Sequence, residues 1–126
     1  MNSRRVAVLG LLLAMVMSPK SNAAPPALAQ VEISYLLDFV KSSGCQFFRN
    51  DTWYDSQGAE GHLRQKYDWL VARDQVGTAE EFIEKAATRS SLSGRAYWIR
   101  CNADPAETTS QWLRRALANY RLRAER

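Results

Sequence analysis

An uncharged apolar run near the N-terminus divides this chain into two unequal parts. Residues 6–17 (VAVLGLLLAMVM) contain no charged side chain, and Arg4 and Arg5 precede them. A membrane-spanning helix needs about 20 apolar residues, so this run is too short to span a membrane, whereas its length and positive start are typical of a secretory signal peptide. We therefore expect residues 1–23 to be a cleavable signal peptide and residues 24–126 to form one globular domain of about 103 residues.

Small residues around position 23 indicate where the peptide is cleaved. Signal peptidase requires small side chains at the last and third-last positions before the cut, and Ser21 and Ala23 provide them. Residues 27–29 (ALA) fit the same rule but lie further from the apolar run. An uncleaved anchor and a twin-arginine signal at Arg4 and Arg5 are the alternatives. No cysteine follows the cleavage region, which argues against a lipoprotein.

Cleavage changes the charge of the expected domain. The whole chain has 17 Lys and Arg against 13 Asp and Glu, a net charge of +4. Arg4, Arg5 and Lys20 belong to the predicted signal peptide, which leaves 14 basic residues against 13 acidic ones, a net charge of +1. Nucleic-acid binding needs a basic surface, so we expect no nucleic-acid partner, and no membrane span after cleavage.

Both cysteines, Cys45 and Cys101, lie in the expected domain. In an oxidising compartment two cysteines most simply pair with each other. Such a bond would close 56 residues of chain, which the loop-entropy argument values at about 4 kcal/mol. The alternatives are two buried thiols or one redox-active cysteine, although no CxxC motif is present.

The spacing of apolar residues predicts helices over residues 27–42, 56–73 and 79–89, and a fourth that begins at Asp104-Pro105 or at Ser110. In the first helix Leu28, Val31, Tyr35 and Phe39 recur at helical spacing, and Ile33, Leu36 and Val40 broaden this apolar stripe. Gly44 follows it, where a helix commonly ends in a positive φ. In the third, Thr78 and Glu81 predict a capping box.

Three short β-prone runs lie between these helices. Residues 45–49 and 52–54 flank Asn50-Asp51, which predicts a hairpin, and residues 96–101 form a third strand. In the Trp53-Tyr54 and Tyr97-Trp98 pairs, one member should be less buried than the other, because successive side chains of a strand point to opposite faces. The predicted fold class is α+β: four helices with a small antiparallel sheet of about three short strands, closed by one disulfide.

Several ordered sequence blocks resemble a known family. They are Glu32-Ile33-x-Tyr35-Leu36-Leu37, Ser43-Gly44-Cys45-x-Phe47-x-Arg49-Asn50, Trp53-Tyr54, His62-Leu63-x-x-Lys66-Tyr67, Thr78-Ala79-Glu80-x-Phe82-Ile83, Ser90-Ser91-x-Ser93-Gly94, Tyr97, Arg100-Cys101 and Trp112-Leu113. Together they resemble the YfeK-like family of small exported bacterial proteins of unknown function. Asp51 departs from the pattern, where a small residue such as Gly is more common. The resemblance implies class and compartment, but no mechanism.

One face of the helix over 56–73 is basic and aromatic. His62, Lys66, Trp69 and Arg73 share it by their spacing, and His62 is the only histidine in the chain. One interpretation is a surface that binds an anionic group, with His62 titrating near neutral pH. The other is a helix face packed on a neighbouring loop, in which His62 has a structural hydrogen bond.

A hydroxyl nucleophile at Ser91 or Ser93, with His62 as its base, is the enzymatic alternative. Such chemistry needs the base within hydrogen-bond reach of the hydroxyl and usually a third, orienting group. The spacing does not bring the candidate carboxylates Glu32, Asp68 and Glu84 to these residues, and residues 90–94 do not form a Gly-x-Ser-x-Gly elbow. We therefore assign no catalytic residue.

The sequence predicts no metal site and no cofactor. Zinc takes three or four protein ligands, yet the chain has one histidine and its two cysteines are expected to be oxidised. No calcium-loop motif is present either. Arg49, Arg95 and Arg100 flank the strands and can bind carboxylates or phosphates through bidentate hydrogen bonds. Their alternative is ion pairing with Glu32, Asp38 or Glu84.

These observations lead to one preferred function and two alternatives. We expect a non-enzymatic periplasmic binding or interaction protein, whose partner is an envelope component or a periplasmic protein. The candidate binding residues are Arg49, His62, Lys66, Ser91, Ser93 and Arg100. The alternatives are a small hydrolase or transferase that uses His62 with Ser91 or Ser93, and a secreted inhibitor of a cell-wall enzyme that presents residues 90–95 as a rigid exposed loop.

Overall fold

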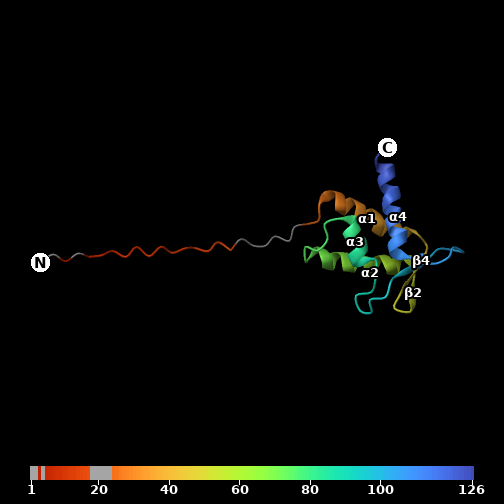
Figure 1. Cartoon of the computed structure of the whole chain (residues 1–126), viewed down its shortest axis with the longest axis horizontal. Coiled ribbons are helices and arrows are strands. Elements are labelled where there is room, and N and C mark those ends of the chain that lie inside the picture. The colour runs from red at the N-terminus through yellow and green to blue at the C-terminus, as the bar shows by residue number, and fades with distance from the viewer. Residues whose placement is uncertain (1–2, 4, 18–23) are drawn as a thin grey trace.

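The computed structural model describes residues 3, 5–17 and 24–126 (Figure 1). Over these residues the elements follow in the order α1 (Ala27–Ser42), β1 (Gln46–Arg49), β2 (Thr52–Tyr54), α2 (Ser56–Val71), α3 (Ala79–Ala86), β3 (Trp98–Arg100), β4 (Glu107–Thr108) and α4 (Thr109–Ala124). The predicted α+β class with four helices is confirmed for this part of the chain. Its antiparallel sheet has four strands, one more than expected, in the order β2-β1-β3-β4.

The apolar run over residues 6–17 forms no helix or strand and is exposed along its length. The predicted cleavage residues Ser21 and Ala23, like Arg4 and Lys20, lie outside the described residues. None of the helices in the described part of the chain combines the length and the apolar character that a membrane crossing requires.

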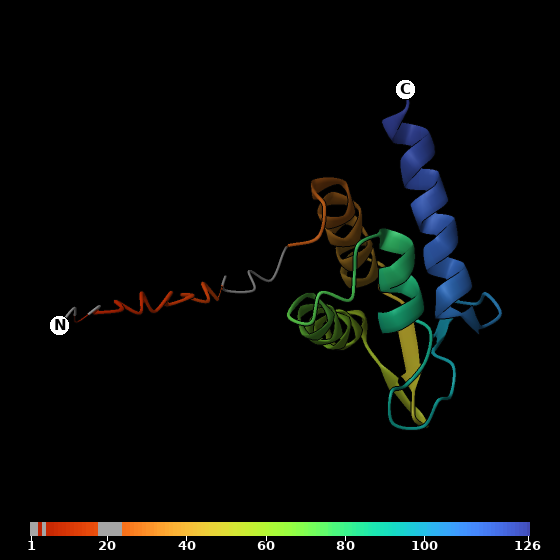
Figure 2. The ribbon, with the colours of Figure 1, turned by 60° about the vertical axis from the view of Figure 1, so that its left-hand side comes forward.

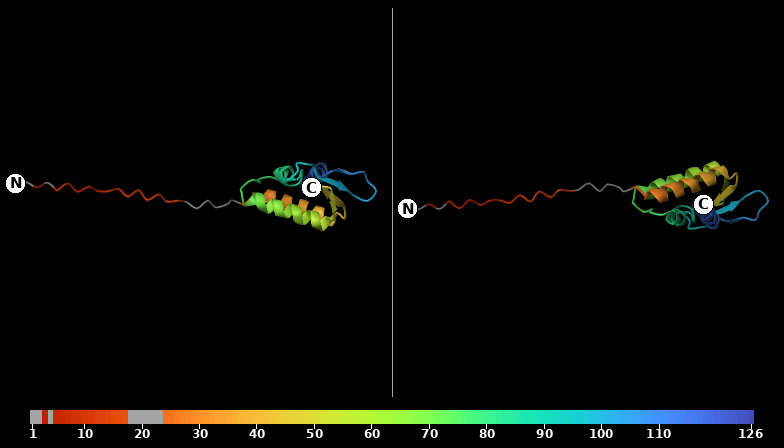
Figure 3. Two further views of the ribbon diagram at one scale, coloured as in Figure 1. Left: turned by 90° about the horizontal axis from the view of Figure 1, so that it is seen from below. Right: turned by 90° about the horizontal axis from the view of Figure 1, so that it is seen from above.

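The helices form two layers, with the sheet at one end. Figure 3 shows α1 and α2 side by side in one layer and α3 and α4 in the other, and Figure 2 shows α4 extending beyond α3 toward the C-terminus. α1 finishes and α2 begins beside the sheet, where the hydroxyls of Ser43 and Ser56 lie 3.2 Å apart. The start of α2 therefore lies at the same end of the molecule as the strands. The start of α4 lies there too, because α4 directly follows β4.

Side chains from every helix and from the central strands meet in the core. The most completely buried large ones are Ile33, Leu36, Leu37, Val40, Phe82, Ile83, Ile99 and Leu113. The predicted stripe of α1 is confirmed at Ile33, Leu36 and Val40, but Leu28 and Val31 are 70% and 54% exposed. Tyr35 and Phe39 lie at the edge of the core, where their rings pack against Tyr120 and Trp112 of α4.

The predicted hairpin is confirmed, and its turn is a tight one. Phe48 pairs with Trp53 and Arg49 with Thr52, which leaves Asn50 and Asp51 as a two-residue loop. Both have positive φ, 48° and 66°, as a type I′ hairpin turn requires. The Arg95 guanidinium donates two hydrogen bonds to the Asp51 carboxylate, at 2.9 and 2.8 Å. The hairpin is thereby joined to the loop over residues 90–95.

The predicted disulfide joins Cys45 and Cys101, whose Cα atoms lie 4.5 Å apart. Its place follows from the pairing of the two central strands. Gln46 of β1 faces Arg100 of β3, so the adjacent residues just beyond the ladder are the two cysteines. Gly44 has a φ of +66°, which confirms the predicted positive-φ position after α1.

The predicted start of α4 at Asp104-Pro105 is wrong, and the alternative at Ser110 is one residue late. Glu107 and Thr108 form β4 instead, paired with β3, because this extended backbone completes the edge of the sheet. The Thr108 hydroxyl then caps α4 by accepting from the Gln111 amide at 3.3 Å.

The helices α2 and α3 end earlier than predicted, at Val71 and Ala86. After α3 the chain is no longer helical, and Arg89 pairs with Ala96 in an isolated antiparallel β-bridge. The Thr78 hydroxyl accepts from the Glu81 amide at 3.0 Å, as the capping box predicts. The reciprocal bond of the predicted box, from the Thr78 amide to the Glu81 carboxylate, is not found among the described residues, and that carboxylate instead accepts from Lys85 at 3.2 Å.

Candidate functional site

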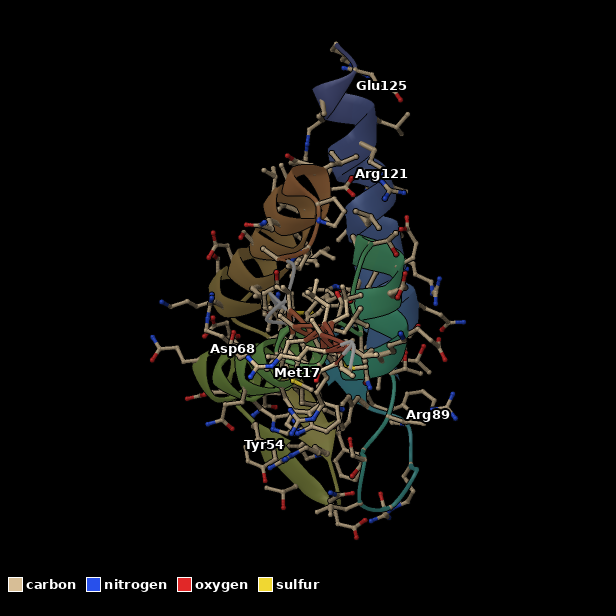
Figure 4. The ribbon with its side chains drawn as sticks, turned by 90° about the vertical axis from the view of Figure 1, so that its left-hand side faces the viewer. Met17, Tyr54, Asp68, Arg89, Arg121 and Glu125 are labelled. Atoms are coloured by element: carbon tan, nitrogen blue, oxygen red, sulfur yellow. A yellow bond between two sulfur atoms is a disulfide. The ribbon has the colours of Figure 1, made fainter. Side chains whose placement is uncertain are left out.

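A cluster of polar side chains lies where the sheet meets α2. Arg49 ends β1, and its side chain points to the same side of the sheet as the buried Phe47, two residues earlier. His62 and Lys66 lie one turn apart on α2, and Tyr97 immediately precedes β3. Figure 4 shows the labelled Tyr54 of β2 near the α2 end of the sheet.

Hydrogen bonds connect these side chains into one network. Arg49 Nη1 lies 3.1 Å from Nδ1 and 3.3 Å from Nε2 of His62, and Arg49 Nη2 donates to Tyr54 Oη at 3.2 Å. His62 Nε2 lies 3.2 Å from Tyr97 Oη. Lys66 Nζ donates to the same phenol oxygen at 3.2 Å and to the Arg89 carbonyl at 3.0 Å.

This network requires a neutral imidazole. A guanidinium has no acceptor, so the His62 nitrogen that faces Arg49 must be the unprotonated one. When Nδ1 accepts from Arg49, the Nε2 hydrogen is donated to Tyr97 Oη. That oxygen also accepts from Lys66, which leaves the hydrogen of the phenol without an acceptor among the residues that the structure describes.

The pKa shifts of His62, Lys66 and Tyr97 each favour the uncharged form of the side chain. Burial, and then the positive charges of Arg49 and Lys66, together lower the pKa of His62 from 6.5 to about 4. Burial, and then Arg49, also lower the pKa of Lys66. The pKa of Tyr97 is raised by burial, which outweighs the opposite effect of Arg49. At neutral pH His62 is therefore uncharged between two cationic side chains.

No carboxylate neutralises these two cations within the described residues. The Asp and Glu side chains that form ion pairs there do so with other bases. In particular Glu32 binds Arg121, and Glu84 binds Arg89 and Arg114. The predicted ion pairs of Arg49 and Arg100 with Glu32, Asp38 or Glu84 are absent from that set, so Arg49 keeps an uncompensated charge.

A small cavity of about 50 Å³ lies beside the network. Arg49, His62, Tyr54 and Tyr97 line it together with apolar side chains that include Leu63. Thr109, the first residue of α4, also lines it. The Thr109 side chain is 1% exposed, and its hydroxyl oxygen has no hydrogen-bond partner among the described residues. A buried polar atom without a partner is uncommon in a folded protein and calls for an explanation.

A second, wider hollow lies next to the first, on the α2 side. Its lining includes His62, Lys66, Trp69 and Ser91. His62 therefore lines both hollows, while Lys66 lines only the wider one. Arg73 packs over the Trp69 ring, with its guanidinium carbon 3.8 Å from the ring centre.

The structure brings together only part of the predicted set of binding residues. Arg49, His62 and Lys66 are joined, and Ser91 lines the adjacent hollow. Ser93 instead donates to Asn50 Oδ1 at 2.7 Å. Among the described residues no hydrogen bond links His62 to either serine, so the geometry that a serine nucleophile needs is not formed there.

Arg100 does not belong with the other candidates. It pairs across the ladder with Gln46, one residue out of phase with the buried Phe47 and Ile99, so its side chain lies on the opposite face of the sheet from Arg49. There it donates to Gln46 Oε1 at 2.8 Å and covers the Trp53 ring at 3.8 Å. The predicted grouping of Arg100 with His62 is therefore wrong.

Sequence reasoning missed three members of the site: Tyr54, Tyr97 and Thr109. Tyr97 had a signal, because one residue of each aromatic pair was expected to be less buried than its neighbour, whereas Trp53 and Tyr54 are both partly buried and the expectation did not single out Tyr54. Tyr97 is indeed 5% exposed and Trp98 41%. Nothing local indicated Thr109, whose place depends on how α4 packs at the sheet. The described residues contain no group of three or more His, Cys, Asp or Glu side chains arranged to hold a metal ion.

Comparison with known proteins agrees with the resemblance found in the sequence blocks. The model of a family described as "Family of unknown function (DUF5329)" matches residues 27–121. The chain is 32% identical over 91 residues to the "Uncharacterized protein YfeK" of Salmonella typhimurium (strain LT2), an alignment that covers 72% of each sequence. No solved structure matches the chain.

Proposed function

Because the chain belongs to DUF5329, a family of unknown function, we propose its role from its own geometry: it is an exported, non-enzymatic binding protein that holds an anionic group at Arg49, His62 and the adjoining Lys66. The partner is an envelope component or a periplasmic protein that carries this group. The site requires no cofactor and no metal ion.

One observation carries the proposal: the cluster is rich in hydrogen-bond donors and poor in acceptors. Arg49 and Lys66 are cationic, and neither forms an ion pair with a carboxylate of the described chain. The Thr109 hydroxyl has a hydrogen to donate, and so has the Tyr97 phenol when Nε2 of His62 carries the imidazole proton. Charges in a partly buried site are normally paired, so an anion is the group that this site lacks.

The hydrogen bonds support binding rather than catalysis. His62 is used by Arg49 and Tyr97, and Ser93 is used by Asn50. A nucleophile needs its base within hydrogen-bond reach, and the described residues do not provide that pairing for Ser91 or Ser93.

Export is the second part of the proposal. Residues 1–23 have the composition of a signal peptide, and the Cys45–Cys101 disulfide is compatible with an oxidising compartment such as the periplasm. Mass spectrometry of the protein recovered from a periplasmic extract tests it. We expect a chain that begins at Ala24, whereas a protein that retains residues 1–23 and sediments with membranes would contradict the signal-peptide assignment.

A second candidate function is supported by the loop over residues 90–95. The Ser90 carbonyl accepts from the Gly94 amide, and the Ser90 hydroxyl accepts from the Asn50 side chain. Arg95 also donates to Asp51, so these bonds hold the loop against the hairpin. Leu92 at its tip is 92% exposed. A braced loop with an exposed apolar tip suits an inhibitor of a cell-wall enzyme. Inhibition of such an enzyme, lost in Leu92→Ser and retained in Arg49→Gln, would favour this function over anion binding.

Calorimetric titration with acetate and with inorganic phosphate tests the anion site. Arg49→Gln should weaken binding of whichever probe binds by about tenfold or more, because charged hydrogen bonds are lost. Arg64→Gln is the matched control, since Arg64 is an exposed α2 arginine that pairs with Glu60 at 2.7 Å, and should bind like the unmodified protein. Equal affinity of both variants, or no binding of either probe to the unmodified protein, would refute the site.

A further inference from the structure

The small cavity has properties that narrow the class of anion it accepts. Its volume of about 50 Å³ compares with the 10–15 Å³ or so that one water molecule needs by the same measure, so it has room for about four heavy atoms. This is the size of a carboxylate with a short aliphatic group. A sugar or a nucleotide is too large to fit inside as a whole, whereas the carboxylate end of a longer chain fits.

The walls of the cavity favour a group that is polar at one end only. Phe47, Ala59 and Leu63 contribute apolar surface, and the lining residues with polar groups are Arg49, Tyr54, His62, Tyr97 and Thr109. Inorganic phosphate presents oxygen in every direction, so some of its oxygens would face these apolar side chains without a donor, which is unfavourable. A short carboxylate presents two oxygens to the donors and a methyl or methylene group to the apolar wall.

The donors that remain free also match a carboxylate. A guanidinium has five N–H groups, and those of Arg49 that bind His62 and Tyr54 leave others to donate to a carboxylate. Thr109 lines the cavity, and its buried hydroxyl has no partner among the described residues. Thr109 is also the first residue of α4, a sixteen-residue helix whose N-terminal end carries partial positive charge.

From these features we propose that the cavity binds a short aliphatic carboxylate, with Arg49 and the Thr109 hydroxyl donating to its oxygens and its carbon atoms packed against Ala59 and Leu63. This inference rests on the proposed anion site and specifies its ligand class. Two sources carry this chemistry: a free short-chain acid, and the C-terminal residue of a peptide that ends in alanine. Both present a carboxylate on a carbon that bears a methyl or methylene group.

The test compares three probes on the unmodified domain by NMR titration: propionate, N-acetylalanine and inorganic phosphate. We expect propionate or N-acetylalanine to bind at least tenfold more tightly than phosphate, and the tighter of the two identifies the source. Phosphate binding as tightly as the tighter of the two carboxylates would overturn the inference while leaving the anion site in place. If none of the three binds, both proposals fail.

Thr109→Val tests the role of the hydroxyl separately. The substitution replaces the unpartnered Oγ1 with a methyl group of similar size, so the free protein should melt at the same temperature or higher. Binding of the carboxylate should weaken by about tenfold, since one hydrogen bond to a charged group is lost. Thr109→Ser, which keeps the hydroxyl, should retain binding.

A Thr109→Val protein that binds the carboxylate as tightly as the unmodified protein would overturn the role of Thr109. If this variant does not fold, the comparison of carboxylate with phosphate on the unmodified protein still decides the ligand class.

Discussion

The polar cluster lowers the affinity of His62 for a proton, which makes the stability of the folded protein depend on pH. Burial and the charges of Arg49 and Lys66 hold its pKa at about 4, compared with 6.5 for an unperturbed imidazole. Between these pH values the unfolded chain binds a proton at His62 and the folded chain does not. Lowering the pH from 6.5 to 4 therefore favours unfolding, and this contribution of His62 is constant above and below that window.

The size of the effect follows from the same two values. One pKa unit corresponds to about 1.4 kcal/mol, so the shift sets a ceiling of about 3.4 kcal/mol. Because the ring is only partly buried, solvent screens the charges, and we expect about 1–2 kcal/mol of the free energy of unfolding to be lost between pH 7 and pH 4. The groups that face the ring are Arg49, Lys66 and Tyr97.

The assay benefits from His62 being the only histidine in the chain. In an untagged domain, NMR titration of the imidazole Cε1–H follows this residue alone. Urea unfolding of the unmodified domain and of His62→Gln at several pH values gives the free energy of unfolding of each protein. The difference between the two proteins isolates the contribution of His62, because the carboxylates that titrate in the same range contribute equally to both. A measured pKa of 6.5 or higher, or the same pH dependence in both proteins, would refute the reasoning.

Three stability predictions concern the framework that holds the site. Reducing the Cys45–Cys101 bond should lower the free energy of unfolding by about 4 kcal/mol, because it closes a separation of 56 residues; urea unfolding with and without reductant measures this, and a loss under about 1 kcal/mol would contradict it. Glu32→Gln should cost about 2 kcal/mol in a thermal melt, since this carboxylate, 5% exposed, accepts from Arg121 at 2.7 and 3.0 Å; an unchanged melt would show that the pair adds nothing. Gly44→Ala should cost about 1 kcal/mol because φ is +66° and no atom lies within 4 Å of an added Cβ; Gly44→Asn, which tolerates this φ better, should cost less, and equal losses would indicate another cause.

Local signals in the sequence predicted much of this fold. The bounds of α1, the hairpin turn at Asn50-Asp51 and the cap at Thr78 each depend on residues within a few positions of one another. The disulfide was also predictable, because the domain contains only two cysteines.

Features set by long-range packing were not predictable in this way. The short β4 exists because Glu107 and Thr108 pair with β3, and this pairing overrides the helix-start signal of Asp104-Pro105. Helical spacing alone does not say which face of α1 meets the other helices, so the exposure of Leu28 was missed.

In the candidate site, too, local spacing predicted some residues and long-range packing determined the others. The i, i+4 spacing on α2 predicted that His62 and Lys66 lie together. The alternation of side chains along β1 between the two faces of the sheet is compatible with the place of Arg49 beside them. Thr109 enters the site only because α4 begins against the sheet, a contact between segments far apart in the chain. Arg100 was misplaced because the strand register, which sets its face, is not visible in the sequence.

The most direct test of an anion site beside His62 is the pKa of this single imidazole with and without bound ligand. Burial, and then the charges of Arg49 and Lys66, lower the pKa of His62 from 6.5 to about 4. A carboxylate or phosphate held next to Arg49 offsets the part of this shift that comes from positive charge. The account predicts that saturating propionate or phosphate raises the NMR-measured pKa of His62, and that Arg64→Gln shows the same increase. A pKa that does not change at saturating concentrations of either anion would contradict it.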